Sequence, residues 1–99
     1  NPDVEVFISI ASAWEIQIKA ALQKLELHES VDALYRSLII DHGFRMLGIE
    51  LGDIAELATL PSHHRDPFDR MLVAQTRRGN FALLTKDDII SSYGVSTLW

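Results

Sequence analysis

The stretch HRDPFDRMLV, residues 64–73, carries the clearest structural signal in the chain. Asp66 followed by Pro67 is the pattern of a helix N-cap with proline at the first helical position. Asp69 follows three residues after Asp66, so two carboxylates belong to the start of one helix. One face of this helix is marked by Phe68, Met71, Leu72 and Gln75. The Gly-Asn pair at 79–80 ends the pattern, which predicts a helix over residues 66–79.

On both sides of this helix, runs rich in β-branched and aromatic residues alternate with runs of helical spacing. The predicted strands are 4–10, 44–49, 81–85 and 95–98, and the other predicted helices are 13–23, 30–41 and 51–60, with a turn or short helix at 86–90. Such alternation implies right-handed crossovers and a mainly parallel sheet with helices on both faces. We therefore expect a three-layer α/β/α fold that forms one domain over residues 1–99.

Helix-capping residues mark several of these boundaries. Ser12, three residues before Glu15, predicts a capping box at the start of the first helix. Ser30 is the predicted N-cap of the second helix, and Gly43 is its predicted C-terminal stop. The first helix also carries one apolar stripe, formed by Trp14, Ile18 and Leu22.

Composition narrows the possible functions. The 99 residues include no cysteine, which excludes disulfides, thiolate nucleophiles and cysteine-based zinc sites and fits a cytoplasmic protein. The net charge of −5 argues against broad phosphate binding, although metal ions can supply positive charge locally in a nucleic-acid enzyme. No apolar run approaches the roughly 18 residues needed to span a bilayer, so we expect no membrane partner.

Acidic residues recur where the predicted helices begin. Glu15 and Asp87 each follow a predicted strand, and the carboxyl ends of parallel strands meet at one edge of a sheet. Carboxylates gathered at one edge repel each other unless a cation lies between them. Mg²⁺ and Mn²⁺ prefer oxygen ligands and are held by few carboxylates. Together with Asp69, these residues suggest a metal site suited to phosphodiester hydrolysis, in which the ion activates water and stabilises the leaving oxygen.

Each polar residue also has a purely structural interpretation. Considered one at a time, Glu15, Asp66, Asp69, Asp87 and Asp88 are better explained as helix caps or first-turn acids. Arg70 is either a phosphate contact or a solvated helical side chain. Four arginines form either a basic patch or a solvated face: Arg65, Arg70, Arg77 and Arg78. The adjacent histidines at 63–64 fit a surface loop better than a metal site.

Three segments together resemble one known family. ISIASAWEIQIKAALQKLEL at 8–27, HRDPFDRMLVAQTRRGNFALLTKDD at 64–88 and YGVSTLW at 93–99 are similar to the PIN-domain ribonucleases, specifically the VapC-type toxins of bacterial toxin–antitoxin pairs. The resemblance implies a PIN-like fold and cleavage of RNA with Mg²⁺ or Mn²⁺. It also implies a homodimer that a cognate antitoxin inhibits by inserting residues into the acidic groove.

The same resemblance assigns roles to individual residues. It implies that Glu15, Asp69 and Asp87 are the catalytic carboxylates and metal ligands. Asp88 is a less favoured substitute for Asp87, and Asp66 supports the site. We add Arg70 to the supporting residues as a possible contact for phosphate or for carboxylates of the antitoxin.

The family pattern begins with a strand that carries an aspartate, followed by a helix, and residues 1–99 start after both. We therefore expect a domain without its first βα unit, one metal ligand and a central strand. Two functions follow as alternatives: a metal-dependent endoribonuclease, or a non-catalytic remnant that keeps a dimerisation and antitoxin-binding surface. A DNA-directed or repair-type nuclease with the same core is a third.

Overall fold

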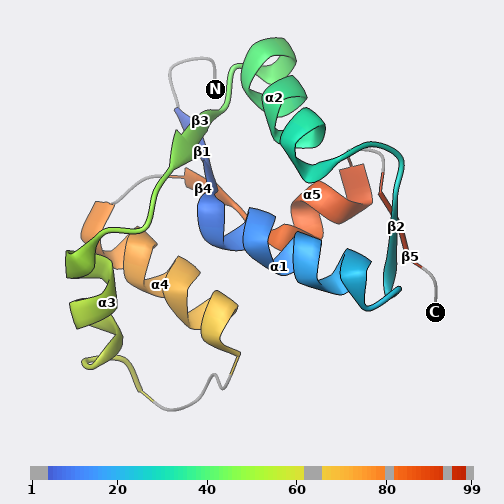
Figure 1. Ribbon diagram of the computed structural model, residues 1–99. Helices are drawn as coiled ribbons and strands as arrows, with labels where there is room; N and C mark the ends of the chain where they lie inside the picture. Colours follow the sequence, from blue (N-terminus) through green and yellow to red (C-terminus); the bar gives the residue numbers. More distant parts are fainter. Residues whose placement is uncertain (1–4, 62–65, 80–81, 93–94, 98–99) are drawn as a thin grey trace.

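The computed structural model describes residues 5–61, 66–79, 82–92 and 95–97, with side chains up to residue 90. Its centre is a parallel sheet of three strands in the order β3–β1–β4 (Figure 1). The strands are β1 (Val6–Ser9), β3 (Arg45–Leu47) and β4 (Ala82–Leu84). This confirms the predicted mainly parallel sheet. β4 lies at an edge of this sheet rather than in its middle, so Ala82 is exposed although its segment is almost wholly apolar.

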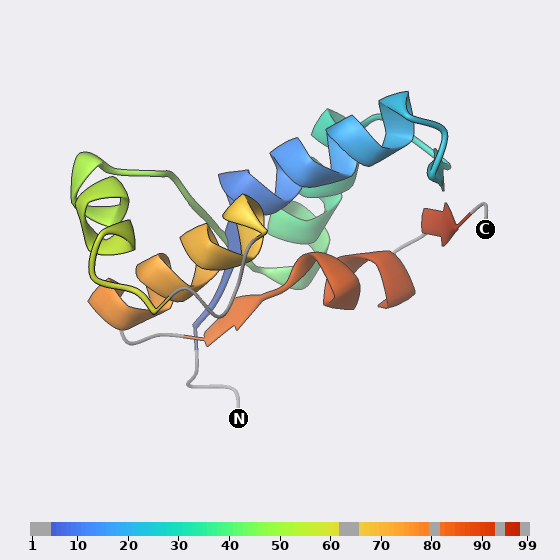
Figure 2. The same ribbon diagram turned by 90° about the horizontal axis from the view of Figure 1, so that it is seen from below.

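Helices flank the sheet. They are α1 (Ile10–Ala21), α2 (Val31–His42), α3 (Leu51–Leu57), α4 (Pro67–Gly79) and α5 (Lys86–Ser92). Two perpendicular views show α3 and α4 towards one end of the molecule and α2 and α5 towards the other (Figures 1 and 2). α1 packs against α2, α4 and α5, so it joins the two ends. None of the described helices is long and apolar enough to cross a membrane.

A second, two-stranded antiparallel sheet joins β2 (Leu25–Leu27) to β5 (Val95–Thr97). The strand at the C-terminal end is predicted by the sequence, but β2 is not, since the sequence predicts no strand between the helices at 13–23 and 30–41. The reason is physical: three residues are too few to show strand periodicity, and the pairing partner is far away in the sequence. Leu98, the last residue of the predicted strand, lies outside the described residues.

The predicted capping box at Ser12 is also wrong. α1 begins at Ile10, and its N-cap is Ser9, whose Oγ accepts a hydrogen bond of 3.0 Å from the Ala11 backbone N–H. Ser12 is therefore a buried residue inside the helix. The apolar run that continues to Ile10 makes the strand look longer than it is. By contrast, the predicted N-cap Ser30 and the left-handed Gly43 are both confirmed.

The main core lies beneath α1 and α2. It contains Ile8, Ile16, Leu25, Leu34, Tyr35, Leu38 and Ile89. The predicted apolar stripe of α1 does not face this core, since Trp14 and Leu22 are 60% and 61% exposed. The buried face of α1 instead includes Ser12, Glu15 and Ile16. A charged residue on the core-facing side of a helix needs an explanation, which the surroundings of Glu15 provide.

We expect Tyr35 to make the stability of the fold sensitive to alkaline pH. The residue is 3% exposed, and its hydroxyl donates a hydrogen bond of 2.9 Å to the Ser9 carbonyl. Burial raises the pKa of Tyr35 above the ordinary value. The unfolded chain ionises this tyrosine near pH 10 while the folded chain keeps the proton. The contribution of Tyr35 to stability is therefore complete below about pH 10 and declines above it, by about 1 kcal/mol per pH unit.

Denaturant unfolding at several pH values between about 8 and 11 measures this dependence. Tyr35→Phe should be less stable by about 1 kcal/mol at neutral pH, because the buried hydrogen bond is lost. Its stability should fall less steeply than that of the wild type above pH 10. Parallel curves for the two proteins would show that Tyr35 does not carry the alkaline dependence.

Candidate metal centre

The starts of α1, α4 and α5 meet at one place. α1 directly follows β1, and α5 follows β4 after a single residue. Because β1 and β4 are parallel neighbours, both helices begin at the same edge of the sheet. α4 also packs against α1, which brings the Asp66–Asp69 segment to this edge. Trp14 of α1 contacts Phe68 of α4 edge-on, with ring centroids 5.1 Å apart and an interplanar angle of 87°.

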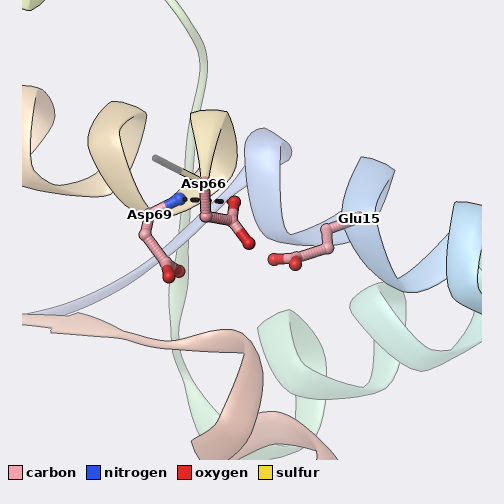
Figure 3. A group of neighbouring side chains, drawn as sticks. All are labelled: Glu15, Asp66 and Asp69. Carbon is pink, nitrogen blue, oxygen red and sulfur yellow. Dashed lines mark hydrogen bonds between the residues drawn. The ribbon is translucent and has the colours of Figure 1, made fainter. Parts of the chain in front are cut away.

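Three carboxylates converge where these helices meet. Glu15, Asp66 and Asp69 each offer one oxygen atom, and these atoms lie within 4.8 Å of one another (Figure 3). In Figure 3 the carboxylate of Glu15 points toward that of Asp66. Glu15 is buried, Asp66 is half-buried and Asp69 is exposed. The group therefore runs from the protein interior to the surface, where an ion or a substrate can reach it.

Asp66 has a structural role as well as a place in this group. Its Oδ1 accepts hydrogen bonds from the backbone N–H groups of Phe68, at 2.8 Å, and Asp69, at 3.2 Å. This confirms the predicted N-cap of α4. The second of these hydrogen bonds holds the backbone of Asp69 in the first helical turn. The Asp66 side chain thus caps α4 and belongs to the carboxylate group at the same time.

Glu15 is the buried member of the group. Its Oε2 faces two ammonium groups, with Lys86 Nζ at 3.2 Å and Lys19 Nζ at 3.7 Å. Its Oε1 is buried and has no hydrogen-bond partner among the described residues. A buried polar atom without a protein partner is uncommon in a folded protein, and it often marks a place where water or an ion binds. Oxygen donors from three carboxylates are the ligand set that Mg²⁺ or Mn²⁺ prefers.

Among the described residues, Lys86 has the shortest ion pair with this group, and its side chain is only 14% exposed. Burial alone lowers the pKa of its ammonium. The hydrogen bond to Glu15 and the charge of that carboxylate outweigh burial, with further contributions from Asp87 and Asp69. The pKa of Lys86 is therefore raised above its ordinary value, and the side chain is positively charged at neutral pH.

A comparison with protein families agrees with this geometry. The family model of the PIN domain matches residues 2–95. The chain belongs to the PIN domain family. No significant match was found among curated proteins or among solved structures. PIN domains are in general nucleases and typically use divalent metals, and the carboxylate group of Glu15, Asp66 and Asp69 could hold such an ion.

The two aspartates after β4 have different positions in this PIN domain. The side chain of Asp87 is 86% exposed, and its Oδ1 lies 3.8 Å from Lys86 Nζ. Asp88 forms a capping box with Thr85. The Asp88 Oδ2 accepts a hydrogen bond of 3.0 Å from the Thr85 backbone N–H. In return, Thr85 Oγ1 accepts a hydrogen bond of 3.2 Å from the Asp88 backbone N–H. Neither residue belongs to the carboxylate group found within the described part of the chain.

Arg70 lies beside the acidic residues in sequence but points to another element. Its guanidinium donates to the backbone carbonyls of Leu57, at 3.0 Å, and Pro61, at 2.9 Å. It therefore ties the end of α3 and the segment after it to α4. These contacts support a structural role for Arg70 and do not supply evidence for a phosphate contact.

Two more arginines of α4 also bind α3. Arg78 pairs with Asp53 at 2.8 Å, and Arg77 pairs with Glu56 at 3.4 Å. Arg77 and Arg78 therefore do not form a large basic patch around the acidic group. Three residues that the sequence also suggested for this region lie outside the described residues: His63, His64 and Arg65.

Lys86 borders the site, although the sequence does not assign it to the site. In the sequence, Lys86 is notable only for its position between the end of the predicted strand at 81–85 and the candidate ligand Asp87. No pattern in the sequence indicated that it contacts Glu15, which lies 71 residues away.

Proposed function

We propose that this PIN domain is a Mg²⁺- or Mn²⁺-dependent endoribonuclease of the toxin type, neutralised by a cognate antitoxin protein. The observation that carries the proposal is the buried, unpartnered Oε1 of Glu15 beside Asp66 and Asp69. PIN-domain membership supports a nuclease with an RNA substrate. The cytoplasm is the proposed place of action because cellular RNA is available there.

Glu15, Asp66 and Asp69 are the proposed ligands. When bound, a divalent ion supplies an activated water and stabilises negative charge on the phosphate that is cleaved. Glu15 provides a ligand oxygen from a buried position, which limits its motion. Asp66 caps α4 and thereby orients Asp69. We retain Asp87, which resemblance favours, as a further candidate ligand because Lys86 contacts both Asp87 and Glu15.

Protein partners are also part of the proposal. Exposed apolar side chains line the outer face of α1, at Ile10, Trp14, Ile18 and Leu22. Apolar surface of this kind is often covered by another protein chain. It supports the proposed homodimer and antitoxin complex.

A second candidate function belongs to a different class. Lys86 and Lys19 already neutralise part of the charge on Glu15. A chain whose acidic group is satisfied by its own lysines could act as a non-catalytic module for dimerisation and antitoxin binding. Binding of a divalent ion separates the two functions, since only the nuclease requires it.

The test is cleavage of a structured RNA by the full chain, with Mg²⁺, with Mn²⁺ and with excess chelator. We expect cleavage only with metal and a loss of roughly 100-fold in Asp69→Asn, because the charge of one ligand is removed. The fold should survive, since Asp69 is exposed and asparagine is tolerated at a helix start. Thermal unfolding of the variant checks this.

Asp87→Asn decides whether Asp87 is a further ligand, because it makes the same chemical change at an exposed position of another helix start. We expect its activity to stay within roughly threefold of the wild type if Asp66 is the third ligand. A loss as large as that of Asp69→Asn would make Asp87 a ligand. Cleavage that persists in chelator, or an unimpaired Asp69→Asn, contradicts the mechanism. Competition by single-stranded or duplex DNA distinguishes a DNA-directed nuclease.

A further inference from the structure

An ammonium group of the protein itself lies at the candidate metal centre. Lys86 is the first residue of α5, and its Nζ lies 3.2 Å from Glu15 Oε2 and 3.8 Å from Asp87 Oδ1. A second lysine, Lys19, reaches the same Glu15 oxygen from one turn further along α1, at 3.7 Å. Lys86 is the closer and the more buried of the two, with 14% of its side chain exposed compared with 29% for Lys19.

The buried position of Glu15 depends on this contact. Its side chain is 3% exposed, and an ionised carboxylate in such a position is costly unless it is paired. The two lysines face Oε2 and leave Oε1 without a partner among the described residues. The ammonium of Lys86 therefore orients the carboxylate so that one oxygen is held by the protein and the other is available to a ligand.

The same positive charge opposes an incoming cation. Like charges separated by a few ångströms in a partly buried site repel each other far more strongly than they do in water. A divalent ion at Glu15, Asp66 and Asp69 would lie near the Lys86 ammonium, because both share the Glu15 carboxylate. Lys86 thus has two opposite effects: it stabilises Glu15 before the ion binds, and it weakens the binding of the ion.

We propose that Lys86 is an internal counter-cation that sets the divalent-ion affinity of this site. It holds Glu15 in the metal-free protein and keeps the affinity low enough for the bound ion to exchange with the ion in solution. The proposal rests on the proposed function, because it presupposes a divalent ion at Glu15. It deepens that function by naming the residue that decides how much free metal ion is needed for loading.

The experiment is a titration of the full chain with Mn²⁺ alone, without RNA, in which free Mn²⁺ is followed by electron paramagnetic resonance. Lys86→Met removes the charge and keeps the length of the side chain. We expect it to bind Mn²⁺ about tenfold more tightly than the wild type. Lys86→Arg keeps the charge and should bind like the wild type. Lys24→Met is the matched control, because Lys24 is exposed in the turn after α1.

Thermal unfolding provides a second readout. Without metal, Lys86→Met should unfold at a lower temperature than the wild type, since Glu15 loses its closest cation. With saturating Mn²⁺ this difference should disappear or reverse, because the ion stabilises the folded form that binds it. If Lys86→Met does not fold without metal, Mn²⁺ should restore its folding. A deficit that is the same with and without Mn²⁺ overturns the proposal.

The possible outcomes separate this proposal from the proposed function. Equal or weaker Mn²⁺ binding by Lys86→Met, beside a wild type that binds, overturns the role of Lys86 and leaves the metal centre intact. A wild type that binds no Mn²⁺ overturns both. Tighter binding by Lys24→Met as well shows a general charge effect and overturns the specific role of Lys86.

Discussion

Replacing Glu15 with glutamine is expected to lower metal-dependent RNA cleavage on the order of 1000-fold, more than any other single change at the site. Glu15 is the buried carboxylate of the group, and its Oε1 has no partner among the described residues. Charge counts for more in a desolvated position than at the surface. Glutamine has nearly the same shape but offers a neutral oxygen and an N–H donor, which repels a cation.

Single-turnover cleavage and Mn²⁺ binding measure this effect, and both should decrease together. The fold should change less, because Lys86 and Lys19 are partly exposed and can turn toward water. Glu26→Gln makes the same chemical change at an exposed residue of β2 and should leave cleavage unaltered. Cleavage by Glu15→Gln within about threefold of the wild type would contradict a ligand role for Glu15.

Ser9→Ala is expected to destabilise the protein by about 3 kcal/mol, which corresponds to a fall of roughly 15 °C in Tm. Ser9 is fully buried at the end of β1. Its Oγ accepts from the Ala11 backbone N–H at 3.0 Å and donates to Gln75 Oε1 at 2.7 Å. Alanine removes the N-cap of α1, worth about 1 kcal/mol, and leaves the buried oxygen of Gln75 unpaired.

Ser30→Ala is the control for the capping contribution alone. Ser30 caps α2 by accepting one exposed hydrogen bond of 3.1 Å from the Ala33 backbone N–H, so its loss should cost only about 1 kcal/mol. Chemical denaturation compares the two variants. The double variant Ser9→Ala with Gln75→Leu should be less destabilised than the sum of its single changes, because the Gln75 oxygen that Ser9→Ala leaves unpaired is absent from it. Equal losses for Ser9→Ala and Ser30→Ala would show that the contact with Gln75 contributes nothing.

Most local features of the fold were predictable from the residues. Asp66 before Pro67 predicts the start of α4, and the structure confirms it by hydrogen bonds to Phe68 and Asp69. Errors arose where two local signals competed. Ser9 and Ser12 are both good N-caps, and only the length of β1 decides that Ser9 is the one used.

The site was predictable only in part. The sequence placed Glu15 and Asp69 together, and the structure brings them within 4.8 Å in a group that also contains Asp66. Asp66 was expected to support the site rather than to join it. The choice between Asp66 and Asp87 depends on how α4 and α5 are oriented around α1, which no local pattern determines.

The sequence by itself determined the starts of α2 and α4, four of the five strand segments described and membership of the PIN domain family, because capping bonds and periodicity act over a few neighbouring residues. The stretch HRDPFDRMLV needed no tertiary context to indicate a capped helix with two aspartates. Only the tertiary structure decided that Glu15 is buried, that Lys86 holds its Oε2 across 71 positions of sequence and that its Oε1 remains available. These properties arise from the parallel pairing of β1 with β4, which brings the starts of α1 and α5 to one edge.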